Sequence, residues 1–177
     1  RTYPGTHPKR GSFFTRGSTR DRYARYTEEG GPYVDNMERL LRKFDTAKTL
    51  VPAPIITSAK SRTPYGVIYF GSTSPAMSEA AELLAEDGIV LDLMRIRAFP
   101  FGREVTDFIA AHERVFLVEQ NRDAQLRTLL LAECGIDPAV LTSILHYDGT
   151  PITARFIQEA ITGTLKAVPE GVRVKSE

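Results

Sequence analysis

Hydrophobic residues between positions 65 and 167 follow a strand-then-helix pattern that repeats four times. Short apolar runs predict strands near residues 66–70, 90–97, 114–118 and 140–146. Each run is followed by a segment whose apolar residues share one face of a helix. Because successive β–α units build parallel sheets with helices on both faces, we predict an α/β fold of three layers with a mostly parallel sheet.

Capping signals support two of these helices. Ser74 is a candidate N-cap, with Pro75 at the first helical position, and Gly88 suits the C-terminal cap. Thr150 and Pro151 give the last helix the same start signal.

The first 64 residues lack the repeat. Residues 1–32 hold eight Gly and Pro residues without a hydrophobic period, which predicts an irregular arm. A helix should follow, because four apolar residues share one face: Met37, Leu40, Leu41 and Phe44. The expected organisation is an arm (1–32), a helix and Pro/Ser/Thr-rich linker (33–64), the α/β domain (65–167) and a tail (168–177).

Charge distinguishes the arm from the rest of the chain. The 177 residues are 42% hydrophobic and 25% charged, which allows a core of ordinary size. The net charge of +1 argues against a nucleic-acid partner. Residues 1–26, however, contain seven basic residues and one acid, a net charge of +6. This asymmetry predicts an anionic ligand or an acidic partner surface for the arm.

Cysteine usage and hydropathy indicate the compartment. Cys134 is the one cysteine, so no disulfide can form within the chain, which suits a cytoplasmic protein. No apolar run approaches the roughly 18 residues that span a bilayer, and no signal peptide is visible, so no membrane partner is expected. The chain begins at Arg1 without a methionine, and we expect it to be a fragment or a processed chain.

Candidate polar groups gather where the predicted strands end, because ligands of open parallel sheets bind beyond the carboxyl ends of the strands. Ser72, Thr73 and Ser74 precede a helix and form either an anion cradle or a simple cap. Glu119, Gln120 and Asn121 are dense in polar groups, and three readings stay open for them: part of a site, a subunit seam, or the cap of the next helix.

The remaining chemistry-bearing residues are scattered. His146 ends an apolar run, where it is either a hydrogen-bonded rim residue or a catalytic base, and His112 ends a helix whose last carbonyls it can contact. His7 suits a turn. With three separated histidines and one cysteine, the sequence predicts no metal site, and no catalytic constellation is visible.

Three stretches together resemble one enzyme family. They are "YPGTHPKRGSFFTRGSTRDRYARYTE", "YVDNMERLLRKFDTAKTL" and "YGVIYFGSTSPAM…AFPF…VFLVEQNRDAQL". In this order they are similar to the C-terminal part of the alpha subunit of 2-oxoglutarate:ferredoxin oxidoreductase, also called the 2-oxoacid:acceptor oxidoreductase alpha subunit. The resemblance covers roughly residues 1–160. It implies that residues 65–167 form the transketolase C-terminal-like domain, and that the arm leaves a pyrimidine-binding domain preceding Arg1.

The resemblance also implies an activity. The family decarboxylates a 2-oxoacid oxidatively, forms an acyl-CoA and passes electrons to ferredoxin. Thiamine diphosphate, Mg²⁺ and a [4Fe-4S] cluster are implied, held mainly by a partner beta subunit, with CoA as co-substrate. Expected partners are this beta subunit, the N-terminal remainder of the alpha subunit and ferredoxin. One cysteine cannot hold a four-iron cluster, so we expect no activity from the chain alone.

Within the arm, the resemblance points to an active-site loop. Arg16 is the first candidate for binding the 2-oxoacid or CoA, followed by Thr19 and Arg20, because arginine forks and hydroxyls bind carboxylate and phosphate. The alternative is that these arginines pair with acids across a subunit seam. We expect Phe13, Phe14, Tyr23, Tyr26 and the helix stripe to be interface anchors. Alternatives for the whole chain are a non-catalytic assembly module and a small-ligand-binding α/β module.

Overall fold

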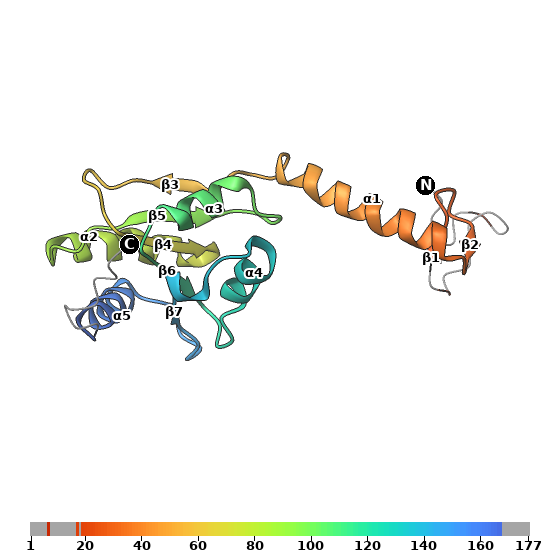
Figure 1. Ribbon diagram of the computed structural model, residues 1–177. Coiled ribbons are helices and arrows are strands. Elements are labelled where there is room, and N and C mark those ends of the chain that lie inside the picture. Colours follow the sequence, from red (N-terminus) through yellow and green to blue (C-terminus); the bar gives the residue numbers. More distant parts are fainter. Residues whose placement is uncertain (1–6, 8–16, 18, 168–177) are drawn as a thin grey trace. The chain divides into compact units, whose positions relative to one another are not determined.

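A computed structural model describes residues 7, 17 and 19–167 (Figure 1). The chain divides into two compact units, residues 1–50 and 51–177. None of the helices in the described part of the chain has the length and apolar composition needed to cross a bilayer.

A five-stranded sheet forms the centre of the second unit, in the order β3-β5-β4-β6-β7. Its strands are β3 (Ile55–Thr57), β4 (Tyr65–Phe70), β5 (Asp92–Ile96), β6 (Arg114–Glu119) and β7 (Leu141–Leu145). The last four pair in parallel, which confirms the four predicted strands and the mostly parallel sheet.

The prediction of a helix and a linker for residues 33–64 is wrong in one place. Strand β3 lies in the linker and pairs antiparallel with β5. Pro52 and Pro54 obscured this strand in the sequence. Proline is nevertheless compatible with the start of an edge strand, where fewer backbone N–H groups have to join the ladder.

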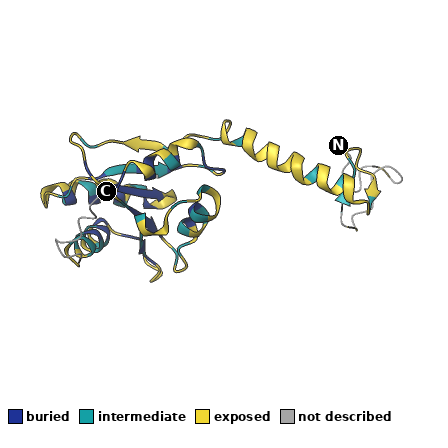
Figure 2. Ribbon diagram, viewed as in Figure 1, coloured by how far each residue is buried: buried dark blue, intermediate teal, exposed yellow. Residues whose placement is uncertain are grey.

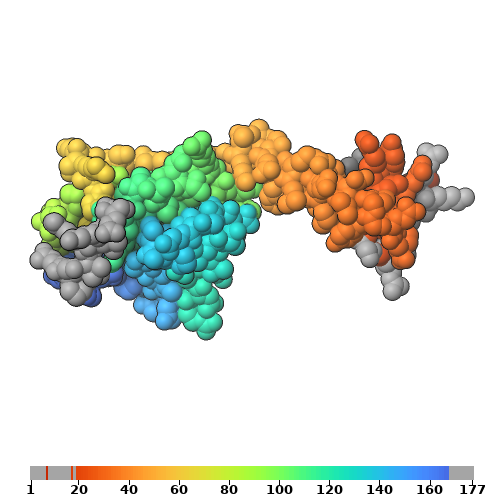
Figure 3. Space-filling view, viewed as in Figure 1, coloured from red at the N-terminus to blue at the C-terminus, as the bar shows by residue number. Residues whose placement is uncertain are grey.

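Helices cover both faces of the sheet. One core cluster joins the sheet to α2 (Ser74–Glu86) and α5 (Ala154–Ala167), and a second joins it to α3 (Arg103–Ala110) and α4 (Gln125–Cys134). Burial is concentrated in the central strands (Figure 2). In the space-filling view, α3 in green and α4 in cyan cover one face (Figure 3). This three-layer arrangement matches the expected fold class.

The structure confirms one end of α2 and corrects the other. Gly88 adopts φ +77° and donates its N–H to Ala85 at 3.0 Å, while Ile89 donates to Leu84 at 2.8 Å, which is a Schellman cap. Ser74 is not the N-cap: it is the first residue of α2, because the short 3-10 helix Gly71–Thr73 runs directly into it.

The start of α5 also differs from the prediction. Thr150 does not cap it, since its N–H and hydroxyl both donate to Asp148, at 2.8 and 2.7 Å. The helix begins at Ala154 instead, and the Thr153 hydroxyl accepts the N–H of Phe156 at 3.2 Å. The aspartate turn thus removes Thr150 from the helix start.

The first unit contains a small hairpin and a long helix. The hairpin strands β1 (Thr19–Arg20) and β2 (Tyr26–Thr27) pair antiparallel, so the predicted irregular arm is wrong for these residues. Helix α1 (Gly30–Lys48) starts before residue 33, where the helix was expected to begin. Pro32 can lie in its first turn, because a proline there removes no intrahelical hydrogen bond. No residue of α1 is buried, and all four residues of the predicted apolar stripe are exposed.

Beneath the sheet of the second unit, His112 is fixed between two elements. Its Nδ1 lies 2.7 Å from the Phe108 carbonyl oxygen and its Nε2 lies 3.0 Å from Asp92 Oδ2, which confirms the expected contact with the helix end. The other Asp92 oxygen accepts the Ala59 N–H at 2.7 Å. Gly66 leaves room for this packing, since a Cβ there would lie 2.8 Å from the Phe108 ring.

We predict that Asp92→Asn lowers the free energy of unfolding by about 1–3 kcal/mol, because the buried His112 loses its charged acceptor. Chemical denaturation of the wild type and the variant measures the difference. The control is Asp107→Asn, which removes the exposed Arg103–Asp107 pair and should cost less than about 1 kcal/mol. An equal loss in both variants would contradict the prediction.

Candidate functional site

The hairpin of the first unit is shaped by one aspartate. Asp21 Oδ1 accepts the N–H groups of Tyr23 at 2.8 Å and Arg25 at 2.9 Å, while Ala24 adopts the left-handed conformation with φ +65°. These bonds close the turn and bring β1 and β2 into register, with Thr19 opposite Thr27 and Arg20 opposite Tyr26. The turn therefore fixes the direction in which the two candidate residues of β1 leave the backbone.

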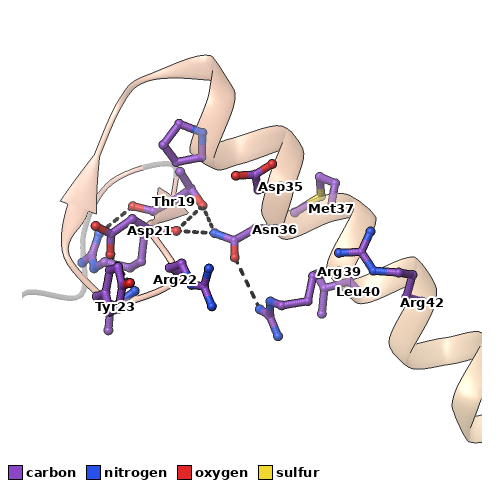
Figure 4. A pocket seen from close by; sticks show the side chains of 13 residues that line it. Thr19, Asp21, Arg22, Tyr23, Asp35, Asn36, Met37, Arg39, Leu40 and Arg42 are labelled. Carbon is purple, nitrogen blue, oxygen red and sulfur yellow. Dashed lines mark hydrogen bonds between the residues drawn. The ribbon is translucent and has the colours of Figure 1, made fainter.

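Asn36 of α1 joins this hairpin to the helix (Figure 4). Its side-chain amide donates to the Thr19 hydroxyl at 3.0 Å and to the carbonyl oxygen of Arg20. Its Oδ1 accepts a hydrogen bond from Arg39 at 3.4 Å. One side chain thus positions a predicted site residue and a second arginine.

A groove of about 980 Å³ lies between the hairpin and the first half of α1. Thr19 and Arg20 line it, together with three further arginines, Arg22, Arg39 and Arg42. Two acids, Asp21 and Asp35, also line it, so the arginines outnumber the carboxylates. Arginine presents parallel donors that match carboxylate and phosphate groups, and the groove therefore suits an anionic ligand.

The aromatic ring of Tyr26 packs against Arg20, the arginine of β1. The Arg20 guanidinium lies 5.2 Å from the centroid of the Tyr26 ring, within the range of a cation–π contact. Gly17 (φ +104°) lies so close to this ring that any Cβ there would collide with it. The hydrogen bond from Tyr26 to Glu28 raises the pKa of the Tyr26 hydroxyl above its ordinary value.

The structure brings together two of the three predicted ligand-binding residues. Thr19 and Arg20 share the groove, whereas Arg16 lies outside the described residues, as do Phe13 and Phe14. The predicted interface anchors Tyr23 and Tyr26 are exposed.

The carboxyl edge of the sheet forms a second polar cluster. The Gln120 side-chain amide donates to the hydroxyls of Ser72 and Thr73, each at 3.1 Å. The ends of β4 and β6 therefore meet at this edge, as the parallel topology predicted. Both hydroxyls accept bonds from within the protein, an arrangement that joins two loops.

Glu119 and Asn121 cap helix α4. The Glu119 carboxylate is fully buried and accepts the N–H groups of Leu126 at 2.7 Å and Arg127 at 3.2 Å. Asn121 donates to Glu119 at 2.9 Å and accepts the Gln125 N–H at 3.2 Å. Of the three readings of this segment, the contacts favour the helix cap, since the negative carboxylate lies at a helix N-terminus.

The histidine of the last strand end is buried and hydrogen-bonded. His146 Nε2 lies 2.9 Å from the Thr150 carbonyl oxygen and 3.3 Å from Asp148 Oδ1. Hydrogen bonds from the Thr150 backbone and hydroxyl lower the pKa of Asp148. These contacts favour a structural, hydrogen-bonded role for His146 at the rim of the sheet over the role of a catalytic base. Within the described ranges, no group of three or more His, Cys, Asp or Glu side chains is placed to hold a metal ion.

Sequence reasoning missed Asn36 and three arginines, Arg22, Arg39 and Arg42, as members of the groove. Asn36 lies 17 residues from Thr19 in the chain, so no local pattern connects them. The spacing of Asn36 and Arg39, one helical turn apart, was the available signal, because residues at i and i+3 share a helix face.

Comparison with known proteins identifies homologues of the chain. No protein-family model matches the sequence. A curated relative, 2-oxoacid:ferredoxin oxidoreductase 2, subunit alpha, from Aeropyrum pernix, is 30% identical over 162 residues. The match covers 89% of this chain and 25% of the relative, so the chain spans about a quarter of that protein's length. The resemblance to part of an oxidoreductase alpha subunit is thereby confirmed.

Solved structures agree on the fold. The 2-oxoglutarate:ferredoxin oxidoreductase from Magnetococcus marinus, with 2-oxoglutarate, coenzyme A and succinyl-CoA bound, superposes with a TM-score of 0.73 at 19% identity, covering 90% of this chain and 27% of that chain. A split-gene transketolase, an inactive beta4 tetramer, reaches a TM-score of 0.51 at 17% identity over 63% of this chain and 42% of that chain. The expected transketolase-like fold is confirmed.

We predict that Asn36→Ala releases the hairpin from α1. Two lost hydrogen bonds, each worth about 0.5–1.5 kcal/mol, should raise the opening equilibrium of residues 19–27 by about 5- to 150-fold. Hydrogen exchange followed by mass spectrometry measures this change. The control, Glu38→Ala, removes an exposed pair with Arg42 on the same helix and should leave exchange in the hairpin unchanged. Equal exchange in the two variants would count against the role of Asn36.

Proposed function

We propose that this chain is the C-terminal part of the alpha subunit of a 2-oxoacid:ferredoxin oxidoreductase. In this proposal the complete enzyme decarboxylates 2-oxoglutarate oxidatively, forms an acyl-CoA and reduces ferredoxin. The homology to the Aeropyrum pernix subunit over 89% of the chain supports the proposal. The fold shared with the Magnetococcus marinus enzyme supports the choice of substrates, since that structure holds 2-oxoglutarate and coenzyme A.

The single observation that supports a ligand role is the arginine-lined groove. Its ligand would be anionic, and both a 2-oxo diacid and CoA meet that requirement. In this proposal the guanidinium of Arg20 donates to the anion, while the Thr19 hydroxyl, which donates to the Arg20 carbonyl and accepts from Asn36, holds this part of β1 in place. Arg16, three residues before Thr19 in the sequence, is the further candidate.

The residues of this chain are poorly suited to bind the cofactors of the reaction. A [4Fe-4S] cluster needs about four thiolates, and the chain has one cysteine. The described residues also contain no acidic or histidine cluster suited to the Mg²⁺ of thiamine diphosphate. We therefore assign both groups to other parts of the complex, above all to the beta subunit.

Partners are proposed from the surface of the first unit. The stripe Met37, Leu40, Leu41 and Phe44 is exposed along α1, and the exposed Tyr23 lies on the hairpin. We propose that these residues pack on the beta subunit or on the N-terminal remainder of the alpha subunit, since an apolar stripe on a helix is normally buried against protein. Ferredoxin would then meet the complete enzyme in the cytoplasm.

A non-catalytic assembly role is the alternative for the second unit, residues 51–177, which we call the sheet unit. The polar groups at its carboxyl edge are engaged in internal bonds, as the contacts of Glu119 and Gln120 show. An enzyme site at that edge would need groups free to bind a substrate. This observation favours assembly over small-ligand binding for the edge.

We predict that the purified chain alone does not reduce ferredoxin with 2-oxoglutarate and CoA, because it lacks ligands for the cluster. Coexpression with the rest of the alpha subunit and the beta subunit should give activity, measured as steady ferredoxin reduction. Activity of the chain by itself, or a complete complex without any, would refute the proposal.

We predict that Arg16→Ala in the complete enzyme raises the KM for one anionic substrate by about 10- to 150-fold, since a charge-assisted hydrogen bond is lost. Arg16→Lys should restore only part, because lysine lacks the planar fork. Titrating the oxoacid and CoA separately, each with the other saturating, identifies the ligand.

The control for Arg16 is Arg25→Ala, an arginine of the described hairpin that does not line the groove. If Arg16→Ala leaves both KM values and kcat unchanged but lowers the Tm of the complex, Arg16 is a structural ion-pair partner and the ligand role is wrong.

A further inference from the structure

The groove of the first unit contains more arginines than a short diacid requires. Arg20 and Arg22 line it from the hairpin, and Arg39 and Arg42 line it from α1. A 2-oxo diacid has two carboxylates, and one guanidinium can bind each of them through parallel hydrogen bonds. The charge of the groove therefore favours a ligand with more anionic groups than a diacid carries.

The acidic neighbours of these arginines balance their charge incompletely. The carboxylate of Asp21 accepts two backbone N–H groups of the turn, at 2.8 and 2.9 Å. Glu38 lies 3.7 Å from Arg42, but both side chains are exposed, and an exposed pair of this kind is weak enough for a phosphate to replace the carboxylate. Arg39 donates at 3.4 Å to the side chain of Asn36, which is neutral.

The arginines reach the groove from both of its walls. Arg39 and Arg42 are one helical turn apart, so they lie on the same face of α1. Figure 4 shows the side chains of Arg22 and Arg39 near that of Asn36, in the space between the hairpin and the helix. The Arg22 guanidinium lies 5.5 Å from the centroid of the Tyr23 ring, within the range of a cation–π contact that supports it.

The size and the apolar lining of the groove favour a ligand larger than a diacid. The volume of about 980 Å³ lies at the upper end of the range of roughly 300–1,000 Å³ that is typical of pockets for drug-sized ligands. Met37 and Leu40 line the groove beside the arginines, with 38% and 37% of their surface exposed. A short diacid has no uncharged chain that could cover these two side chains.

We propose that the groove binds the phosphate groups of coenzyme A, and that the 2-oxoacid binds elsewhere in the complete enzyme. This inference rests on the function proposed above, because CoA is the substrate of that reaction that joins several phosphates to a long uncharged arm. Arg22, Arg39 and Arg42 bind the diphosphate and the 3′-phosphate through charge-assisted hydrogen bonds. The pantetheine arm contacts Met37 and Leu40.

The test compares arginine variants of the complete, coexpressed enzyme with each substrate in turn. Arg39→Gln and Arg42→Gln should each raise the KM for CoA by about 10-fold or more, the effect of one lost charge-assisted hydrogen bond. The KM for 2-oxoglutarate should stay unchanged in both variants. The matched control is Lys43→Gln, which removes the same charge from a neighbouring, exposed position of α1 outside the groove and should change neither KM.

Calorimetric titration of the same complex with CoA alone separates this inference from the function on which it rests. The Kd for CoA should rise by about 10-fold or more in each arginine variant, whether or not the complex turns over. A complex without activity whose CoA binding still depends on these arginines refutes the proposed function and supports the groove assignment. An active complex whose variants change neither KM, or raise both equally, overturns the groove assignment and leaves the function standing. An equal Kd for CoA in the wild type and both variants overturns the assignment in either case.

Discussion

Parallel pairing of β4 with both of its neighbours is the constraint on which the sheet unit depends. Tyr69 of β4 lies in register with Arg95 of β5 on one side and with Val118 of β6 on the other. Parallel neighbours cannot be joined by tight turns, so each connection needs a helical crossover, and the helices cover both faces. Because β4, β5, β6 and β7 run in the same direction, their carboxyl ends lie at one edge of the sheet. At this edge Gln120 contacts Ser72 and Thr73.

Two buried polar side chains of the second unit are satisfied by partners within the protein. Glu119 is fully buried, yet it accepts three hydrogen bonds from the start of α4 and from Asn121. His112 is held between a carbonyl and Asp92. Among the described residues, the Nε of Arg95 and the hydroxyl of Thr162 are buried without such a partner.

Polar contacts organise the described residues of the first unit. Its hairpin is closed by Asp21 and joined to α1 by Asn36, while the apolar stripe of the helix faces outward. These contacts stabilise the described residues of the first unit weakly, because hydrogen bonds contribute only about 0.5–1.5 kcal/mol each and no residue of α1 is buried. The proposed packing on other parts of an oxidoreductase would supply the missing apolar burial.

Local periodicity determined the four parallel strands, the three-layer fold and the cap at Gly88, because apolar runs and turn residues act over a few neighbouring positions. The excess of basic residues in the arm also predicted an anionic ligand or an acidic partner surface, while Arg16, Thr19 and Arg20 were named as candidates only through the family resemblance. Only the tertiary structure decided that β3 joins the sheet, that Thr153 rather than Thr150 caps α5, and that Asn36 completes the groove. Contacts such as Asn36 to Thr19, 17 residues apart, or Gln120 to Ser72, 48 apart, form because the fold brings distant segments together, and no local pattern encodes that distance.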